Sequence, residues 1–491
     1  MSTRWEAVNR PMSPPQAQAT LEADEAEALY APRVRVYSAR VRGSFRRAKW
    51  AILIACLSIY YVLPWIRWDR GPNAPDQAVL LDIWNERFWF FNLEFWPNEI
   101  YYLTGLLITA AVSLFLVTSV LGRVWCGYTC PQTVWTDLFM FIERQLEGDR
   151  NARMRQDAGP LTIDIAWRKL AKHAIWVAIA FWTGGAWIMY FVNAPNAVRA
   201  FWGGYASTEV YLFTGIFTLT TYLLAGWARE QVCMYMCPWP RFQSAMLDEQ
   251  SITTTYQAWR GEPRGKLKTK AAHGDCIDCG ACVHACPTGV DIREGIQLGC
   301  INCGLCIDAC NTIMEKVGRP KWLITWDTLA DQAAKAAGQH KPFRFWRTRT
   351  AIYAALLLLA GIAMATAVTT RPGIKLVALH DRAPLFLRIS DGSFRNAYTV
   401  KISNKSLQPV VFELRSMGLP GATLSVAEQS RPAEMQDLTV GPDRVGTFRI
   451  LVAAVLTPGQ HGSTPFDFVI KNTSSGETAT YRAAFLSPPP T

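Results

Sequence analysis

The chain has 491 residues, half of them apolar, with a net charge of +11 and 13 cysteines. This length allows two or three domains, and all tryptophans and cysteines lie before residue 349, which separates that part from a C-terminal module of ordinary soluble composition. The positive charge gathers beside apolar segments, so it indicates membrane topology and not a nucleic-acid partner.

Residues 1–49 form an N-terminal leader, and its first part, rich in Ala, Glu, Pro and Ser, is expected to be disordered. After it, five segments without a charged residue approach the roughly 17–25 residues that a membrane-spanning helix needs. They are 50–66, 100–122, 174–198, 210–228 and 350–370. The first four predict a four-span membrane core over 50–260, and the last predicts a fifth transmembrane helix.

The positions of Lys and Arg predict the orientation of these spans. Residues 30–49 hold seven basic residues and no acid, and the loop 123–173 holds eight basic residues, whereas the loop 67–99 holds three basic and six acidic residues. The N-terminus is therefore predicted to be cytoplasmic. Five spans then place residues 371–491 in the periplasm, as expected of a multi-pass protein of a bacterial inner membrane.

One motif is repeated just past the second and fourth spans. The chain reads Cys126-Gly-Tyr-Thr-Cys130-Pro131 and, again, Cys233-Met-Tyr-Met-Cys237-Pro238. Spans one and two therefore resemble spans three and four, as two copies of one hairpin, and the two pairs are expected to face each other. On a helix, each pair would be spaced i,i+4 and would present two sulfurs on one face.

These four cysteines have two interpretations. Thiolates with thioethers from Met234, Met236 or Met246 form a soft ligand set that selects Cu(I). Cysteine and methionine are also ordinary interior residues, and a single motif would favour packing. Because the motif is duplicated at matching positions, we predict a metal or redox role. The predicted set is Cys126, Cys130, Cys233 and Cys237, with Met234 and Met236 as weaker candidates.

A cysteine-rich segment, predicted as a ferredoxin-like domain over 261–320, follows the fourth span, with a cytoplasmic connector over 321–349. Its two runs each have the spacing Cys-x2-Cys-x2-Cys-x3-Cys, typical of two [4Fe–4S] clusters. In this pattern the fourth cysteine of each run binds the other cluster. One cluster is therefore assigned to Cys276, Cys279, Cys282 and Cys310, and the other to Cys300, Cys303, Cys306 and Cys286.

Other readings of these eight cysteines are weaker. Two identical four-cysteine runs without a histidine at ligand spacing fit cubane clusters better than zinc, and a cytoplasmic segment disfavours disulfides. Pro287 follows the first run, but Asn311 replaces the usual proline after the second. This departure removes a turn signal and no ligand.

From about residue 372 the sequence changes to short alternating runs bounded by Gly, Pro, Asn, Asp or Ser. Their spacing predicts an antiparallel sandwich of seven strands with an immunoglobulin-like fold. The expected strands are 385–389, 397–402, 410–414, 423–426, 445–451, 466–470 and 478–485.

In this order of parts the chain resembles the FixG/RdxA/CcoG family of cytochrome c oxidase accessory proteins. The resemblance implies a membrane-bound copper reductase that converts Cu(II) to Cu(I) for assembly of cbb3-type oxidases. It implies that the eight ferredoxin cysteines bind clusters and that the four cysteines of the repeated motif bind copper or act as redox thiols. Oxidase subunits or copper-assembly proteins would be the partners.

Two other functions remain open at this stage. A quinol dehydrogenase subunit would share the four-span core with its Cys-x-x-x-Cys-Pro motifs. A non-enzymatic assembly scaffold would use its outer sandwich to bind oxidase subunits. The fifth span disfavours the dehydrogenase, and redox-active clusters disfavour the scaffold. No nucleotide-binding Gly-x-Gly-x-x-Gly follows a strand, so the electron donor is expected to be a partner or quinol.

Overall fold

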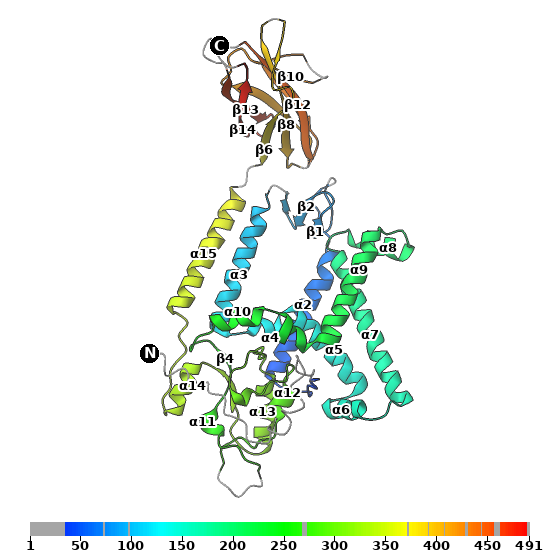
Figure 1. Cartoon of the computed structure of the whole chain (residues 1–491), viewed down its shortest axis with the longest axis vertical. Helices are drawn as coiled ribbons and strands as arrows, with labels where there is room; N and C mark the ends of the chain where they lie inside the picture. The colour runs from blue at the N-terminus through cyan, green and yellow to red at the C-terminus, as the bar shows by residue number, and fades with distance from the viewer. Residues whose placement is uncertain are drawn as a thin grey trace, which may run out of the picture.

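The computed structural model describes residues 35–71, 74–96, 99–267, 273–370, 373–390, 392–406, 408–427, 431–442, 444–455 and 462–488. Figure 1 shows an elongated molecule with three parts along its axis: a cysteine-rich part at one end, long helices in the middle and a β-sandwich at the other end. The leader segment that we predict to be disordered lies outside the described residues.

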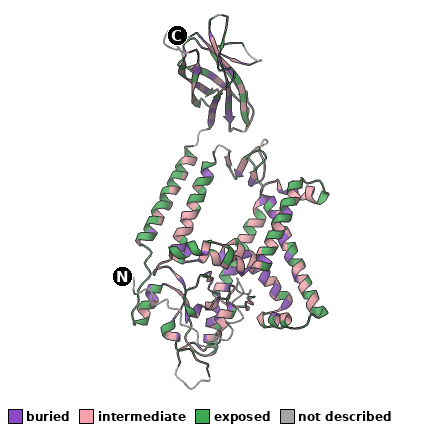
Figure 2. Cartoon of the chain, viewed as in Figure 1, coloured by how far each residue is buried: buried purple, intermediate pink, exposed green. Residues whose placement is uncertain are grey.

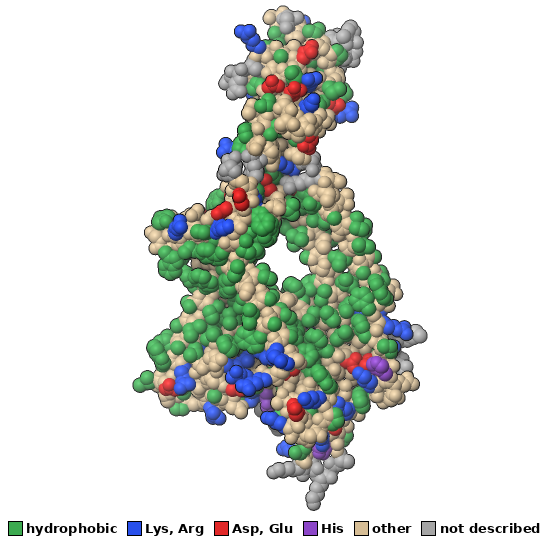
Figure 3. Space-filling model, turned by 180° about the vertical axis from the view of Figure 1, so that it is seen from behind, with side chains coloured by type: hydrophobic (Ala, Val, Ile, Leu, Met, Phe, Trp, Pro, Cys, Tyr) green, Lys and Arg blue, Asp and Glu red, His purple; other side chains and the backbone are tan. Residues whose placement is uncertain are grey.

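Four helices have the length and apolar character needed to cross a membrane. They are α2 (Ser44–Val62, continued by the 3-10 turn η2, Leu63–Trp65), α3 (Tyr101–Leu121), α9 (Thr208–Thr221, continued by the π-helix η4, Tyr222–Ala228) and α15 (Thr348–Thr369). Much of α3 and α15 is exposed (Figure 2), and apolar side chains form a broad belt across the middle of the face seen in Figure 3. Such a belt suits lipid, because apolar surface of this extent is unfavourable in water.

The third predicted span needs a correction. Helix α7 (Ile163–Ile188) begins before the predicted segment 174–198 and ends within it, and a separate helix, α8 (Ala194–Gly203), follows. The break has a local cause: Pro195 lies in the first turn of α8, where its missing N–H is tolerated, whereas inside a longer helix it would remove a hydrogen bond. The first half of α7 carries charged residues, including the buried Lys172, so α7 is not among the four apolar helices.

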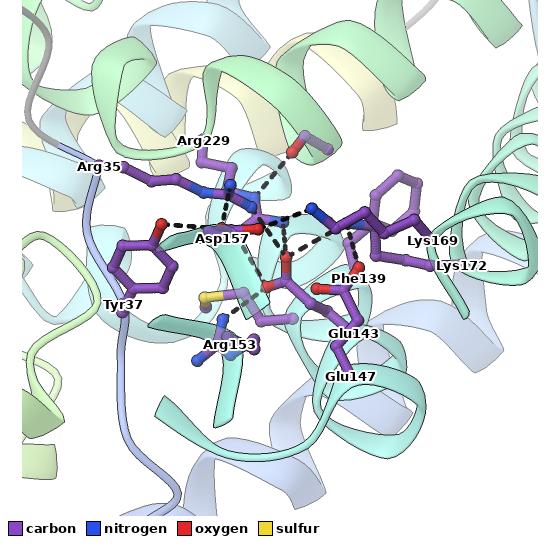
Figure 4. A network of polar contacts seen from close by, with 12 residues as sticks. Arg35, Tyr37, Phe139, Glu143, Glu147, Arg153, Asp157, Lys169, Lys172 and Arg229 are labelled. Carbon is purple, nitrogen blue, oxygen red and sulfur yellow. Dashed lines mark hydrogen bonds and ion pairs between the residues drawn. The ribbon is translucent and has the colours of Figure 1, made fainter. Parts of the chain in front are cut away.

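Among the residues that the structure describes, five further helices lie in the connections that follow α3 and α9. They are α4 (Val124–Tyr128), α5 (Pro131–Glu147), α6 (Arg150–Ala158), the π-helix η5 (Val232–Met236) and α10 (Trp239–Met246). In Figure 4 the buried Glu143 accepts from Arg153 at 2.7 Å and from Arg229 at 2.9 and 3.0 Å, with Lys172 3.7 Å away. Buried charges are tolerated only when paired, so this network ties α5, α6, α7 and the end of η4 together.

The cysteine-rich part extends beyond the predicted range 261–320 at both ends. Strand β4 (Thr253–Tyr256) pairs antiparallel with β5 (Ile324–Asp327), and backbone hydrogen bonds between them close the unit. Between these strands lie α11 (Ala258–Gly261), α12 (Ala281–Ala285), the 3-10 turn η6 (Ile292–Glu294) and α13 (Leu305–Lys316), and α14 (Leu329–Ala336) follows them.

At the other end, the loop after α2 forms an antiparallel sheet of β1 (Val79–Asp82), β2 (Arg87–Phe90) and β3 (Leu93–Phe95). Beyond it lies the sandwich. The sandwich strands are β6 (Ile374–His380), β7 (Leu387–Arg388), β8 (Phe394–Asn404), β9 (Val410–Met417), β10 (Thr423–Val426), β11 (Met435–Val440), β12 (Arg444–Ala454), β13 (Ser463–Asn472) and β14 (Thr478–Leu486). One sheet has the order β10-β12-β8-β6, with β7 also paired to β8, and the other has the order β11-β9-β13-β14. All pairs are antiparallel. The ammonium of Lys405 lies 2.7 Å from the Glu99 carboxylate and links the sandwich to the segment before α3.

The predicted sandwich is correct in kind, but the described residues contain two more strands than predicted. Strands β7 to β10 and β12 to β14 match predicted runs: Leu387–Arg388, Phe394–Asn404, Val410–Met417, Thr423–Val426, Arg444–Ala454, Ser463–Asn472 and Thr478–Leu486. The two that the prediction lacks are β6 (Ile374–His380), which directly follows the apolar α15, and β11 (Met435–Val440). Both alternate between buried and more exposed residues and pack into the shared core.

Candidate iron–sulfur and thiol centre

The two ferredoxin loops have the same backbone conformation. Each reads Cys-Ile-Asp/Asn-Cys-Gly, and in each the third and fifth residues have positive φ: Asp278 (51°) and Gly280 (66°), Asn302 (57°) and Gly304 (73°). Asp, Asn and Gly are the residues that adopt this conformation most readily. The glycines are also the N-caps of α12 and α13, so each loop turns directly into a short helix that carries the third cysteine of its run.

The first predicted ligand group lies around one cavity. Cys276, Cys279 and Cys282 line it from the first loop and Cys310 lines it from α13. Burial and, after it, the nearby Cys282, Cys276 and Cys279 together raise the pKa of the Cys310 thiol to about 12. Cys310 therefore lies with the first run of cysteines, as the crossed assignment predicts.

The second group gathers beside the first. Burial raises the pKa of Cys300 to about 12, with Cys303 and Cys286 as neighbouring thiols that act in the same direction. The pKa of Cys306 is raised by burial and then by Cys303, Cys300 and Cys286. Cys286, from the first run, is thus a neighbour of the second run, and its thiol also lies 3.3 Å from the Thr288 hydroxyl.

This arrangement fits two [4Fe–4S] clusters. Both groups consist of four cysteines in an apolar environment, formed by residues such as Ile307, Met314 and Leu323. In the described part of the chain, no three His, Cys, Asp or Glu side chains converge at the spacing of a single metal ion. Each group offers the four thiolates that a cubane needs, one for each iron.

The structure explains why Asn311, and not a proline, follows the second cysteine run. It lies inside α13, which continues to Lys316, whereas α12 ends at Ala285 just before Cys286 and Pro287. A proline in the middle of α13 would remove a helical hydrogen bond. The Asn311 carboxamide instead accepts a hydrogen bond from the Trp322 N–H at 2.7 Å, which ties α13 to the segment leading into β5.

The four cysteines of the repeated motif do not form i,i+4 pairs within one helix, and this expectation is wrong. Cys126 lies in α4 and Cys233 in η5, but Cys130 (ψ 128°) and Cys237 (ψ 121°) have extended backbone just beyond those helices. The cause is the proline that follows each second cysteine, because proline disfavours helical conformation in the preceding residue.

The two motifs nevertheless have matching backbone geometry. The N–H of Cys130 donates to the Trp125 carbonyl at 2.9 Å and that of Cys237 donates to the Val232 carbonyl at 2.8 Å, five residues back in each case. Four residues before Cys126, Gly122 has φ 62° and ψ −138°; four residues before Cys233, Arg229 has φ 45° and ψ −112°. The repeat seen in the sequence is therefore also a repeat of conformation.

The two motifs come together in space, as the repeat predicts. Burial raises the pKa of Cys126 to about 12, and Cys130, Cys233 and Cys237 are close enough to raise it as well. Burial also raises the pKa of Cys233 to about 12, with Cys130 and Cys237 next in effect among its neighbours. We call these four residues, Cys126, Cys130, Cys233 and Cys237, the thiol quartet.

The first motif packs directly on the second ferredoxin loop. The hydroxyl of Tyr128 donates to the Cys303 carbonyl at 3.0 Å, and Cys126 packs against Ile301, Cys303 and Leu305. A Cβ placed on Gly127 would lie 2.7 Å from the Ile301 carbonyl oxygen and 3.1 Å from the Cys303 Cα, so only glycine allows this approach. The quartet therefore adjoins the cysteines of the second group.

The second motif is more open. Tyr235, the counterpart of the buried Tyr128, is 72% exposed, and Met236 is 63% exposed. Met234 points towards the ferredoxin part, because a Cβ on Gly299 would lie 3.7 Å from its terminal methyl. Of the two weaker thioether candidates, Met234 lies near Gly299, which directly precedes Cys300, whereas Met236 is exposed.

Three polar residues that the sequence analysis did not single out support this junction. Arg123 donates to the carbonyls of Leu298, Cys300 (3.3 Å) and Pro240 (2.6 Å). Gln243 accepts from the Cys126 thiol at 3.1 Å and donates to the Thr118 hydroxyl at 3.3 Å. Asn302 joins the second loop to the end of α3. Only Arg123 had a signal in the sequence, its position three residues before the first motif.

Three family models match the chain. A 4Fe–4S dicluster domain matches residues 228–329, and a 4Fe–4S binding domain matches residues 103–147. The immunoglobulin-like fold at the C-terminus of FixG matches residues 364–488. The second match covers α3, α4 and α5 with Cys126 and Cys130, and the first covers Cys233, Cys237 and all eight ferredoxin cysteines.

Curated relatives match along almost the whole chain. The nitrogen fixation protein FixG of Rhizobium meliloti is 44% identical over 96% of this chain and 98% of its own length. The proteins RdxA and RdxB of Cereibacter sphaeroides are each 46% identical, over 87% and 88% of this chain and 91% of their own lengths.

Proposed function

The chain belongs to the FixG and RdxA family, and on this premise we propose that it reduces Cu(II) to Cu(I) at the thiol quartet. The product would serve assembly of the copper centre of a cbb3-type cytochrome c oxidase. One observation supports the proposal above the others: the first motif packs on the loop of Cys303, so the quartet adjoins the cysteines of the second cluster group.

When bound, the two [4Fe–4S] clusters supply a one-electron relay. The protein's residues position the acceptor: Cys126 and Cys130 adjoin the ferredoxin loop, and Cys233 and Cys237 belong to the more open motif. Each Cu(II) gains one electron and becomes Cu(I), which thiolate ligands favour. The exposed Tyr235 and Met236 mark the open side, from which copper would enter.

Copper binding would require the quartet to lose protons. The Cys126 thiol is half-buried and donates to Gln243, whose side chain is itself fully buried and held by Thr118. Metals bind the thiolate and displace its proton, so binding is expected to strengthen as the pH rises. Gln243 acts here as a positioning residue, since it holds the Cys126 sulfur and does not itself contact a cluster.

The cellular setting is part of the proposal. The chain would cross a bacterial inner membrane five times, with the clusters and quartet on the cytoplasmic side and the sandwich in the periplasm. Copper-assembly proteins or oxidase subunits would receive Cu(I). Reducing equivalents would come from a separate donor, because the sequence carries no nucleotide-binding glycine motif.

The test compares two variants of the full chain, purified without oxygen and reduced with dithionite. The quadruple variant C126S/C130S/C233S/C237S removes the quartet, and Cys56→Ser removes the one remaining cysteine as a matched control. We expect the control to reduce Cu(II) like the wild type, measured with a Cu(I)-specific chelator, and the quadruple variant to fall to the rate of a cluster-free chain. Equal rates in both variants would exclude the quartet.

A second reading of the quartet has one observation in its favour: the 4Fe–4S binding domain matches residues 103–147, where Cys126 and Cys130 are the only cysteines. The quartet would then hold a further cluster. Iron analysis of the same variants separates the readings. If the quartet binds copper, the wild type and the quadruple variant should both hold eight iron atoms per chain, four for each of two clusters. If the quartet holds a third cluster, the quadruple variant should contain less iron than the wild type.

A further inference from the structure

The start of α2 and the middle of α5 enclose a basic cavity that the proposed function does not use. Its volume is about 640 Å³, and five arginines line it: Arg40, Arg42, Arg46, Arg47 and Arg144. Trp50 and Phe141 form its apolar side. Trp50 lies in the apolar helix α2, and Figure 3 shows Lys and Arg side chains gathered below the apolar belt.

Most of this positive charge is not neutralised by the protein. Arg46 is paired with Asp137, at 2.8 and 2.9 Å, and lies over the Trp50 ring. In the part of the chain that the structure describes, the guanidinium groups of Arg40, Arg42, Arg47 and Arg144 have no ion-pair partner within 4 Å. The one acid of the cavity, Asp149, accepts hydrogen bonds from the backbone N–H groups of Arg40 and Arg150.

Arg144 is the most informative of these residues. Its Nε is buried and has no hydrogen-bond partner in the protein. Burial lowers the pKa of Arg144 to about 10, with Arg46 and Arg153 acting in the same direction and Asp137 and Asp149 acting against it. A buried donor without a partner is unfavourable, so an anion in the cavity would supply both the missing acceptor and the missing charge.

We propose that this cavity binds the headgroup of an anionic phospholipid, with the phosphate among Arg40, Arg42, Arg47 and Arg144. The acyl chains would then run along Trp50 and Phe141 into the membrane. Guanidinium groups pair well with phosphate oxygens, and basic pockets beside membrane helices suit anionic headgroups. The apolar side favours a lipid over a free phosphate, because only a lipid covers both surfaces.

The experiment measures lipid binding by native mass spectrometry of the full cluster-containing chain in detergent. Phosphatidylglycerol is titrated against phosphatidylcholine, and inorganic phosphate forms a third arm. The test variant R40Q/R42Q/R47Q removes three exposed arginines of the cavity. The control variant R155Q/R241Q/R344Q removes three exposed arginines outside it, which likewise have no side-chain partner among the described residues.

We expect the wild type to prefer phosphatidylglycerol, the test variant to bind it about a hundredfold more weakly, and the control variant to bind it nearly as the wild type does. Visible absorbance of the clusters reports that each variant is folded, and the single variant Arg47→Gln should bind with intermediate affinity. Equal losses in both triple variants, or equal binding of the two lipids, would overturn the proposal. So would phosphate binding as tight as that of phosphatidylglycerol, which would assign the cavity to a free anion.

Discussion

Arg229 has a backbone conformation that usually requires glycine. Its φ of 45° and ψ of −112° match the first central position of a type II′ turn, and its counterpart in the first motif is Gly122. The side chain offsets this cost, because the guanidinium pairs with Glu143 and its Nε donates to the Gly226 carbonyl at 2.7 Å. The contacts of Arg229 in the buried network of Figure 4 thus offset its local backbone strain.

Two substitutions of Arg229 separate these contributions. Arg229→Ala and Arg229→Gly both lose the ion pair with Glu143, but only glycine relieves the strain. We therefore expect both variants to be less stable than the wild type, and the glycine variant to be more stable than the alanine variant by about 2 kcal/mol. The apparent Tm of the full chain in detergent, followed by tryptophan fluorescence, checks the order. An alanine variant as stable as the glycine variant would show that the position carries no strain.

At the scale of elements, Asn302 connects the second ferredoxin loop to the membrane helices. Its carboxamide oxygen accepts from the N–H and the hydroxyl of Thr254, both at 2.7 Å, and its nitrogen donates to the Leu121 carbonyl at 2.9 Å. Leu121 is the last residue of α3. One buried side chain thus joins β4, α3 and the loop that carries Cys300 and Cys303.

The other ferredoxin loop provides a matched control for this connection. Asp278 has a positive φ like Asn302, but it is half-exposed, and among the described residues its ion-pair partner is Arg293, at 2.7 Å. Alanine costs backbone strain at both positions, whereas Asn302→Ala also leaves buried partners unsatisfied. We expect Asn302→Ala to destabilise the chain by about 2 kcal/mol more than Asp278→Ala. Thermal unfolding checks this, and faster loss of cluster absorbance in the presence of an iron chelator should accompany it; equal effects would refute the connection.

The sequence predicted those elements whose signal is local. The spacing of the eight ferredoxin cysteines, four long apolar helices and most strands of the sandwich could be read directly. The end of α7 at Ile188 was missed because the apolar composition continues past it, and β6 was missed because it follows the apolar α15 without a change in hydropathy. Arg123, Gln243 and Asn302 could not be predicted, since each acts through partners distant in sequence.

At the scale of the whole molecule, the thiol quartet constrains the topology. Cys126 follows α3 and Cys233 follows α9, and the two cysteines lie together. Two points on the same side of a membrane must be separated by an even number of crossings. Between them lie α7 and α9, so the proposed five-span topology requires α7 to cross together with α9, although α7 carries Lys172 and other charges in its first half. The pairing of Lys172 with Glu147 at 2.7 Å and its position near Glu143 make those charges tolerable at the membrane edge.

Fusions to a phosphatase that folds only in the oxidising periplasm test this topology at three points. If α7 crosses, fusions after Tyr205 and after Pro488 should be active, and a fusion after Gly338 should be inactive. If only α2, α3, α9 and α15 cross, all three results reverse, because every segment after α7 changes sides. The reversed pattern would also place Cys126 and Cys233 on opposite faces of the membrane, and a single quartet serving copper could not form. The proposed copper chemistry therefore requires the five-span topology.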